Sequence, residues 1–259
     1  MSERRPVAVV TGAGRGLGRE IALALAGAGG DVVLAGRDPA GLEAVAEDAA
    51  SVGAGTLGVR ADVTSEEDLA HLASVALDRF GAVDALVANS GVAGPTGPMW
   101  ELDRVSWDET FAVNVTGVFL SARAFLPSMV DRGRGSIVVI GSMTGKRPLW
   151  GRTPYAASKL ALVGLVRSLA VETAGSGVRV NLVSPGPVAG DRMDHVFEMQ
   201  ALGRGISAQE ARAEMVSQIP VGRLIEPREV ADTVVSLAFD ALAAVTGEDL
   251  NVSGGMVMY

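Results

Sequence analysis

The sequence predicts an α/β fold in which a parallel β-sheet is covered by helices. Its 259 residues are 48% hydrophobic but only 4% aromatic, and they include 33 glycines. Such a composition suits aliphatic side chains packed closely between a sheet and its covering helices. Short apolar runs such as Val7–Val10 alternate with Ala- and Leu-rich stretches along the chain. This alternation is typical of strands that are each followed by a helix.

The same alternation predicts the elements in order. Strands are expected at 7–10, 31–35, 56–60, 83–88, 136–140, 178–183 and 249–252. Helices are expected at about 19–28, 40–50, from Thr64 or Ser65 onward, 105–130, 153–173 and 227–239, with two short helices within 190–222. No internal repeat or linker interrupts the series, so residues 1–259 are expected to form a single domain. The polar segment at about 190–222 is long for a connection, which is typical of a lid over a substrate.

Composition also narrows the function classes. A formal net charge of -8 argues against non-specific nucleic-acid binding, which normally needs a basic surface. The chain has no cysteine, which excludes disulfides, thiolate catalysis and cysteine-based zinc sites. His71 and His195 are the only histidines, so we expect no metal site.

The beginning of the chain carries no sign of a membrane or secretory segment. Residues 1–6 lack the apolar region of a signal peptide, and no uninterrupted apolar run approaches the ~20 residues that a membrane span needs. We therefore expect a soluble cytoplasmic protein that binds small molecules and no membrane.

A glycine-rich loop follows the first predicted strand. Gly12, Gly16 and Gly18 would let the backbone turn tightly and let a pyrophosphate approach the N-terminus of the next helix. The spacing is Gly-x-x-x-Gly-x-Gly, wider than the common dinucleotide fingerprint but in the same strand–loop–helix context. We interpret this loop as a phosphate cradle.

The end of the second strand indicates which dinucleotide is bound. About 20 residues beyond the glycines, an Asp or Glu usually holds the ribose hydroxyls of NAD. Gly36 stands there instead, followed by Arg37, and Arg15 lies in the glycine loop. Two guanidinium groups could converge on a 2′-phosphate, which predicts NADP (NADPH) in preference to NAD. The alternative is two solvated surface arginines. Asp38 is interpreted as a helix N-cap before Pro39 at the first helical position.

Tyr155 and Lys159 stand four residues apart at the start of a predicted helix, so their side chains are neighbours on one face. An ammonium beside a phenol stabilises the phenolate and lowers the pKa of the phenol, which brings a proton donor closer to working pH. The alternative is an exposed helix with an extended Lys.

Further candidates follow other predicted strands. Asp62 would lie near an adenine or cap a loop, and Asn89-Ser90-Gly91 forms a small-residue turn that lets a ribose lie close to the backbone. Ser142 ends a strand at the edge where open α/β sheets bind ligands. Pro185-Gly186-Pro187-Val188 is a rigid turn suited to a nicotinamide ring. Asn114, in a long apolar helix, either bridges backbone groups or also holds a water.

Two segments are candidates for the walls of a substrate pocket. The stretch from Gly94 to Trp100 is rich in Pro and Gly. The loop before Tyr155 carries the basic residues Lys146, Arg147 and Arg152, which could attract an anionic substrate or form a solvated charged loop. Trp150 in the same loop could stack on a substrate ring.

Together, the glycine loop, Asn89-Ser90-Gly91, Asn114, Ser142 and Tyr155-x-x-x-Lys159 resemble the short-chain dehydrogenase/reductase family, in its one-domain branch that includes 3-oxoacyl-[acyl-carrier-protein] reductases. The resemblance spans nearly the whole chain. It implies a doubly wound, seven-stranded parallel sheet of Rossmann type with helices on both faces. It also implies a homotetramer or homodimer.

The resemblance further implies roles for individual residues. The catalytic tetrad would be Asn114, Ser142, Tyr155 and Lys159. Tyr155 would exchange a proton with the substrate oxygen, which Ser142 would orient. Lys159 would lower the pKa of Tyr155 and bind the nicotinamide ribose, and Asn114 would hold a water of the proton relay. The cofactor-binding residues would be Gly12, Arg15, Gly16, Leu17, Gly18, Arg37, Asp62, Val63, Asn89, Gly91, Tyr155, Lys159, Pro185, Gly186 and Val188.

Two positions depart from the family pattern. Ala88 replaces the first Asn of Asn-Asn-Ala-Gly, which removes a side-chain amide that would stabilise the sheet. Gly190 stands where the family often has a Thr that binds the nicotinamide amide, so anchoring there must come from the backbone or from neighbours.

The sequence thus predicts an NADP-dependent oxidoreductase that interconverts a ketone and a secondary alcohol. A 3-oxoacyl thioester, a polyketide, a cyclic ketone and a sugar all remain open as substrates. The alternative from another class is a non-catalytic NADP-binding sensor or scaffold, which would usually have lost Tyr155 or Lys159. An epimerase or dehydratase of nucleotide sugars would normally need a larger substrate domain.

Overall fold

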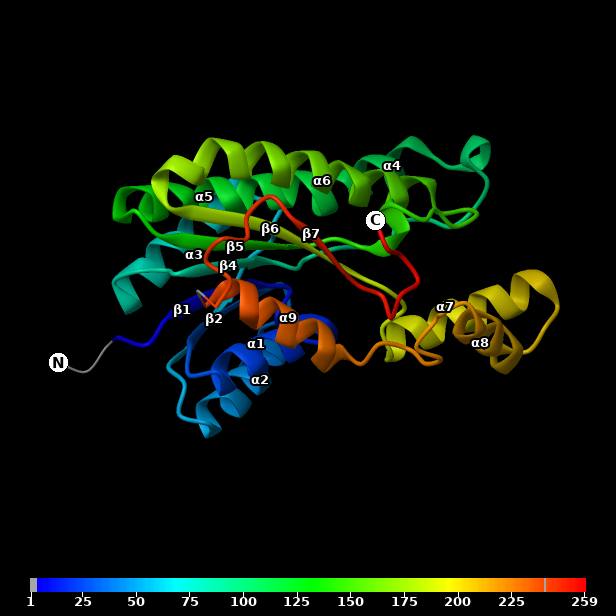
Figure 1. Ribbon diagram of the computed structural model, residues 1–259, viewed down its shortest axis with the longest axis horizontal. Coiled ribbons are helices and arrows are strands. Elements are labelled where there is room, and N and C mark those ends of the chain that lie inside the picture. The colour runs from blue at the N-terminus through cyan, green and yellow to red at the C-terminus, as the bar shows by residue number, and fades with distance from the viewer. Residues whose placement is uncertain (1–3, 240) are drawn as a thin grey trace.

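The computed structural model describes residues 4–239 and 241–259, which form one parallel sheet between two layers of helices (Figure 1). The strands are β1 Val7–Thr11, β2 Asp31–Gly36, β3 Thr56–Arg60, β4 Ala85–Ala88, β5 Gly135–Ile140, β6 Val178–Pro185 and β7 Asp249–Val252. Their order in the sheet is β3-β2-β1-β4-β5-β6-β7. The predicted seven-stranded Rossmann-type sheet is confirmed. Because the order reverses between β1 and β4, a ligand site is expected beyond their carboxyl ends.

The helices cover both faces of the sheet. They are α1 Gly16–Gly27, α2 Pro39–Ser51, α3 Glu66–Phe80, α4 Arg104–Phe111, α5 Gly117–Arg132, α6 Thr153–Thr173, α7 Asp191–Arg204, α8 Ala208–Ser217 and α9 Pro227–Ala238. In Figure 1, α5 and α6 lie above the sheet and α1, α2 and α9 lie below it.

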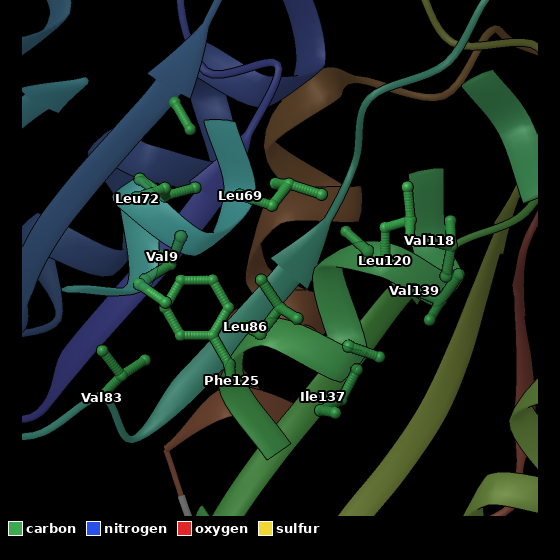
Figure 2. Packing of buried hydrophobic residues seen from close by; sticks show 14 of the residues in the cluster. Val9, Leu69, Leu72, Val83, Leu86, Val118, Leu120, Phe125, Ile137 and Val139 are labelled. Atoms are coloured by element: carbon green, nitrogen blue, oxygen red, sulfur yellow. The ribbon is translucent and has the colours of Figure 1, made fainter. Parts of the chain in front are cut away.

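Strand residues alternate between two cores, as a pleated sheet requires. Val9 points to the face covered by α3, α5 and α6, whereas Val10 points to the face covered by α1, α2 and α9. Figure 2 shows the first of these cores, where the ring of Phe125 from α5 lies among Val9, Leu86 and Ile137. Every residue of β1 is buried, because helices cover both faces of the sheet, and small aliphatic side chains fit this arrangement.

The helical region expected over 105–130 is present and runs from α4 to α5. A π-helical turn at Ala112–Thr116, which the sequence did not indicate, joins the two helices. The buried Asn114 lies in this turn, and a Cβ added at Gly117, just after it, would lie 2.8 Å from Val63 Cγ2. A π-helical turn inserts a residue into a helix without ending it, which rotates the faces of the two halves relative to each other.

Two helical stretches are long and apolar enough to cross a membrane by length and composition alone. They are Arg104–Arg132, which includes the π-helical turn, and Thr153–Ser176. Here α5 packs against β4 and β5, and α6 packs against β6. The small residues Ala161, Gly164 and Ser168 of α6 are exposed, so they do not mediate packing against the sheet.

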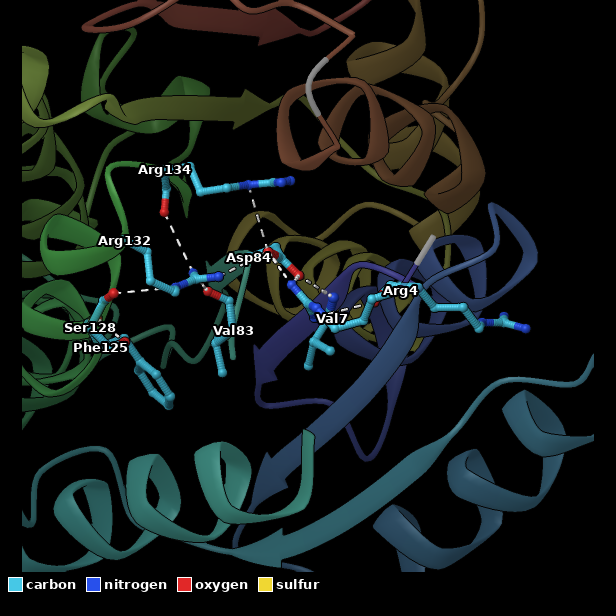
Figure 3. A network of polar contacts seen from close by, with 9 residues as sticks. Arg4, Val7, Val83, Asp84, Phe125, Ser128, Arg132 and Arg134 are labelled. Atoms are coloured by element: carbon cyan, nitrogen blue, oxygen red, sulfur yellow. Dashed lines mark hydrogen bonds and ion pairs between the residues drawn. The ribbon is translucent and has the colours of Figure 1, made fainter. Parts of the chain in front are cut away.

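A buried carboxylate ties the amino edge of the sheet together (Figure 3). Asp84, only 5% exposed, accepts hydrogen bonds from Arg4 at 2.8 Å, from the Val7 backbone N–H at 2.8 Å and from Arg132 at 3.2 Å. Burial alone would raise the pKa of Asp84, but these hydrogen bonds and the charge of Arg4 hold it below its ordinary value. This network lies at the opposite edge from the expected ligand site.

The segment expected to form a lid contains two helices, α7 and α8, which lie to the right of the sheet in Figure 1. They have a small core of their own, formed by Phe197, Ala211, Met215, Ile219 and Leu224. The chain enters α7 through Gly190, whose φ of 128° is a conformation that favours glycine.

Candidate active site

The glycine loop is shaped to receive an anion at the N-terminus of α1. Gly12 and Gly16 have φ of 68° and 54°, and a Cβ added at Gly18 would lie 2.1 Å from the Gly12 carbonyl oxygen. Arg15 at the N-cap position makes no side-chain capping hydrogen bond, so the first N–H groups of α1 stay available to a ligand. The three glycines predicted for phosphate binding are therefore all required by the backbone, and the loop fits the pyrophosphate of a dinucleotide.

Asn89 fastens this loop to β4. Its amide nitrogen donates to the carbonyl oxygens of Thr11 at 2.9 Å and Gly12 at 3.3 Å. The Thr11 hydroxyl in turn accepts from the backbone N–H groups of Asn89 and Ser90. Asn89 therefore supports the loop despite Ala88 before it, and any effect on a cofactor passes through the loop.

Arg37 and Arg15 both lie exposed at the carboxyl edge of the sheet. The turns that carry them touch, because a Cβ added at Gly41 would lie 2.9 Å from the Gly14 carbonyl oxygen. Arg37 also lies 3.9 Å from a carboxylate oxygen of Asp62. With glycine at the end of β2, this corner carries the cationic groups that suit a 2′-phosphate.

Two acidic residues at this corner behave differently. Asp38 occupies the N-cap position and Pro39 begins α2, as predicted, although the Asp38 side chain makes no capping hydrogen bond. Asp62 accepts hydrogen bonds from the backbone N–H and the hydroxyl of Thr64. These two bonds, opposed by partial burial and assisted by Arg37, lower the pKa of Asp62. Asp62 therefore caps its own loop, the alternative that the sequence left open.

Tyr155 lies half-buried in the first turn of α6, between Ser142 and Lys159. Burial would raise the pKa of its phenol, but the Lys159 ammonium, Arg192, a hydrogen bond with Ser142 and Arg152 together hold it below its ordinary value. Ser142 follows β5, and its hydroxyl also accepts from the Thr144 backbone N–H at 3.2 Å. The structure thus brings together a phenol, a hydroxyl and an ammonium drawn from two elements.

Lys159 and Asn114 lie beneath this phenol. Lys159, 5% exposed, donates to the Ile140 carbonyl oxygen at 2.8 Å, and burial is the main cause that lowers its pKa. The Asn114 side chain bonds to both backbone polar groups of Val92 and to the Ser158 hydroxyl. Asn114 therefore bridges backbone groups. A Cβ at Gly91 would lie 3.2 Å from Asn114 Oδ1 and 3.4 Å from Lys159 Nζ, so only glycine leaves the space between them open.

The turn after β6 is held against β7. The Gly186 N–H donates to the Val252 carbonyl oxygen at 2.9 Å, and a Cβ added at Gly186 would lie 2.8 Å from Ser253 Cα. Val188 forms a β-bridge with Ile225. Pro185, Gly186 and Val188 thus form a fixed ledge at the same edge of the sheet as the glycine loop.

The basic loop before Tyr155 is only partly solvated. Lys146 forms a buried ion pair with Asp249 at 2.8 Å, and Arg147 donates to Gln218 at 3.0 Å. Trp150 is exposed. Arg152 donates to Thr96 at 2.9 Å and thereby ties the Pro/Gly-rich segment after β4 to the start of α6.

Two arginines lie beside Tyr155, of which Arg152 was expected only as part of a basic loop that could attract an anionic substrate, and Arg192 was not predicted. The guanidinium carbons of Arg152 and Arg192 lie 4.9 Å and 5.6 Å from the centroid of the Tyr155 ring, and Lys159 Nζ lies 5.9 Å from it. Arg152 stands three residues before Tyr155, a spacing that could have indicated it. Arg192 comes from α7, and no sequence pattern links it to Tyr155.

Comparisons with known proteins agree with this geometry. Residues 12–257 match a family described as Enoyl-(Acyl carrier protein) reductase. The chain is 39% identical over 249 residues to cis-4-hydroxycyclohexanecarboxylate dehydrogenase of Sinomonas cyclohexanicum, covering 96% of this chain and 95% of that protein. It is 35% identical over 252 residues to 3-oxoacyl-[acyl-carrier-protein] reductase of Escherichia coli, covering 97% of each.

Solved structures agree as well. A variant of actinorhodin polyketide ketoreductase, crystallised with NADPH, superposes with a TM-score of 0.94 at 36% identity and 98% coverage of each chain. The matched residues include the glycine loop, most of the sheet and the α7–α8 segment. The chain therefore belongs to the short-chain dehydrogenase/reductase family.

Proposed function

We propose that the chain interconverts a ketone and a secondary alcohol with NADP(H), and that Tyr155 is the proton donor and acceptor. The observation that carries this proposal is the phenol held between the Ser142 hydroxyl and the cationic groups that lower its pKa. A phenol shifted in this way donates a proton to a carbonyl oxygen during reduction and recovers one during oxidation at working pH. When bound, the nicotinamide supplies or accepts the hydride.

Each member of the proposed tetrad has a separate task. Ser142 hydrogen-bonds the reacting oxygen and orients it, which is the positioning part of catalysis. Lys159 keeps its ammonium beside Tyr155 and, with one proton donated to Ile140, has two more to offer a ribose. Asn114 shapes the space opened by Gly91, where a relay water toward Lys159 would find polar partners.

For the cofactor, we propose NADP in preference to NAD. The support is the pair Arg15 and Arg37 at the end of β2 and the glycine in place of an acidic ribose ligand. The remaining contacts would come from the glycine loop with Leu17, from Asp62 and Val63 near the adenine, and from the ledge after β6. A preference for NADH would contradict this assignment.

We also propose that the whole chain works as one domain with residues 190–222 as its lid. Arg192, at the start of the lid, lies beside Tyr155, so the segment reaches the reacting groups. A cytoplasmic location and a homotetramer or homodimer belong to the same proposal. Exposed apolar side chains on α5 and α6, namely Phe119, Leu160 and Val171, support an association of subunits through these helices.

The rival function is a non-catalytic NADP-binding sensor or scaffold. Retention of the phenol, the hydroxyl and the ammonium in reacting positions favours the enzyme, because a scaffold has no use for a phenol of lowered pKa. We propose no single compound as the substrate, because the relatives act on several classes of ketone and alcohol. The relatives' names point to a hydroxycyclohexanecarboxylate and to 3-oxoacyl groups, and the structural neighbour is a polyketide ketoreductase.

The test is the consumption of NADPH over a panel of cyclic, 3-oxoacyl and polyketide-like ketones, with Tyr155→Phe as the critical variant. We expect kcat to fall by about 10²–10⁴-fold, the usual contribution of a general acid, while NADPH still binds. In the oxidation direction, the rate should rise with pH as Tyr155 loses its proton. Undiminished turnover by Tyr155→Phe would refute the mechanism.

A further inference from the structure

In the part of the chain that the structure describes, three cationic side chains lie against the ring of Tyr155. Arg152, Arg192 and Lys159 approach its ring within 4.9, 5.6 and 5.9 Å of the centroid. Among the described residues, neither arginine forms an ion pair with a carboxylate, although most arginines of this acidic chain do. Arg152 donates one hydrogen bond to the Thr96 hydroxyl. Most of the donors of both guanidinium groups are therefore free to bind a ligand.

Two cations beside one phenol repel each other in the absence of a counter-charge. Arg192 acts on Arg152 in this way, because the pKa of Arg152 is lowered chiefly by burial and further by Arg192. An anion bound by both groups would offset this repulsion. Guanidinium is also the side chain best shaped to bind a carboxylate through two parallel hydrogen bonds.

The two arginines come from different parts of the fold. Arg152 precedes α6 and is fixed by the segment after β4, whereas Arg192 lies in the first turn of α7. An anion between them would therefore join the lid to the body of the enzyme. No residue of the cofactor cradle takes part, since the glycine loop lies at the N-terminus of α1.

Resting on the proposed function, we propose that the substrate carries a carboxylate, and that Arg152 and Arg192 bind it beside Tyr155. Both guanidinium groups lie within 6 Å of the centre of the phenol ring. The carboxylate must therefore lie only a few bonds from the carbon that reacts. The substrate is a compact keto acid or hydroxy acid, and this separates it from a carrier-bound thioester, whose reacting end is uncharged.

The test compares each ketone in three forms: the carboxylate, the carboxamide and the methyl ester. A series of keto acids with the carboxylate moved stepwise away from the ketone is measured alongside, with NADPH. We expect kcat/KM to favour the carboxylate over the carboxamide by roughly tenfold to hundredfold, the range of a charge-assisted hydrogen bond. The preference should be greatest for short separations and should fall by about tenfold in Arg192→Ala and in Arg152→Ala.

The matched control is Arg212→Ala on α8, which removes the same charge from the lid at a residue that faces Asp194. This variant should keep the preference for the carboxylate. Arg192→Lys, which keeps the charge but loses the fork of donors, should retain only part of it.

A spectroscopic readout separates anion binding from a purely electrostatic effect on Tyr155. The chain has only two tyrosines, so Tyr259→Phe leaves Tyr155 as the single titrating phenol. Cyclohexanecarboxylate, which has neither a ketone nor a hydroxyl group to react, serves as the bound anion. It should raise the pKa of Tyr155, measured by ultraviolet difference titration, because it offsets the two guanidinium charges. The same anion should leave the titration unchanged in the Arg152→Ala, Arg192→Ala double variant.

Two results would overturn the inference. One is equal or better use of the carboxamide by the unmodified enzyme. The other is an Arg192→Ala variant that weakens NADPH binding or shifts the pH profile while its carboxylate preference is intact, which would assign the arginines to the cofactor or to Tyr155 alone. Turnover of neutral ketones that depends on Tyr155 would leave the proposed function standing in either case. If none of the three forms of any ketone is turned over in a way that depends on Tyr155, the proposed function itself is contradicted.

Discussion

At the scale of single residues, the proposed preference for NADP depends on the charge at the end of β2. Arg37 is 70% exposed and its nearest anionic neighbour, Asp62, is 3.9 Å away, so its guanidinium is only loosely engaged within the chain. Weak engagement leaves it available to a phosphate. Removing it should therefore change cofactor choice more than stability.

We predict that Arg37→Asp weakens NADPH binding by about 10-fold to 100-fold and improves binding of NADH. The new carboxylate repels a 2′-phosphate and accepts hydrogen bonds from free ribose hydroxyls. Dissociation constants of both cofactors, measured by fluorescence titration, check this. Arg60→Asp, a neighbouring charge reversal on β3, is the control. Unchanged NADPH affinity in Arg37→Asp would refute the assignment.

Residue spacing made the centre of the site predictable, and distance in the fold made the rest unpredictable. Tyr155 and Lys159 are one helical turn apart, so the sequence alone puts them on one face. Arg192 lies beside Tyr155 although the two residues come from different helices, α7 and α6, and such a long-range contact is encoded by no local pattern. Asp38 gives a similar example. Its N-cap position follows from local sequence, but its side chain makes no capping hydrogen bond, because the direction of that side chain depends on its neighbours.

At the scale of elements, the first turn of α1 depends on the absence of a single methyl group. A Cβ at Gly18 would lie 2.1 Å from the Gly12 carbonyl oxygen and 2.6 Å from the Asn89 amide nitrogen. Both of those atoms belong to the hydrogen bond that fastens the glycine loop to β4. The loop and the strand cannot both keep their positions if this residue is enlarged.

We predict that Gly18→Ala destabilises the protein by about 1–3 kcal/mol, the usual cost of overpacking, and abolishes NADPH binding. Gly27→Ala is a matched control on the same helix, because a Cβ there meets nothing within 4 Å. It should be neutral or raise stability by about 0.5–1 kcal/mol. Urea unfolding and cofactor titration of the two variants decide the matter, and equal stabilities would show that the loop can relax.

Element boundaries were predicted closely where apolar periodicity is strong. The strand at Thr56–Arg60 and the helix that ends at Thr173 agree with the structure. The π-helical turn at Ala112–Thr116 was missed because apolar residues continue on both sides of it, and periodicity does not record one inserted residue. The turn places Asn114, a member of the proposed tetrad, within hydrogen-bonding distance of Val92 and Ser158.

At the scale of the whole molecule, the candidate site and the buried network around Asp84 lie at opposite ends of the strands. The carboxyl edge carries the glycine loop, Ser142 and the ledge after β6, whereas the amino edge carries the network around Asp84. That network joins the N-terminal segment, the start of β4 and the end of α5 through one carboxylate. Stability can therefore be altered at this edge without touching the reacting groups.

We predict that Asp84→Asn lowers the free energy of unfolding by about 1–3 kcal/mol at neutral pH, because its arginine partners lose a buried charge partner while staying partly solvated. The lowered pKa of Asp84 means that its stabilisation is present above the unfolded-state pKa, near 3.8, and is lost as pH falls through the folded-state value. Unfolding in urea across acidic pH should show the two proteins converging.

The control for this variant is Asp108→Asn, which breaks an exposed pair with Arg104 one turn away on the same helix. Its effect should stay below about 0.5 kcal/mol at every pH. A constant difference between Asp84→Asn and the unmodified protein down to acidic pH would show that Asp84 acts through shape and not through charge.

The separate small core of α7 and α8 has a consequence for how such enzymes diversify. Because Phe197 and Met215 pack in a cluster separate from the two cores of the sheet, residues of α7 can be exchanged without altering those two cores. New recognition groups can then be sampled around an unchanged Tyr155. A lid transplanted between Gly190 and Gly222 should carry its substrate preference to a related body, which makes this segment a natural unit of enzyme engineering.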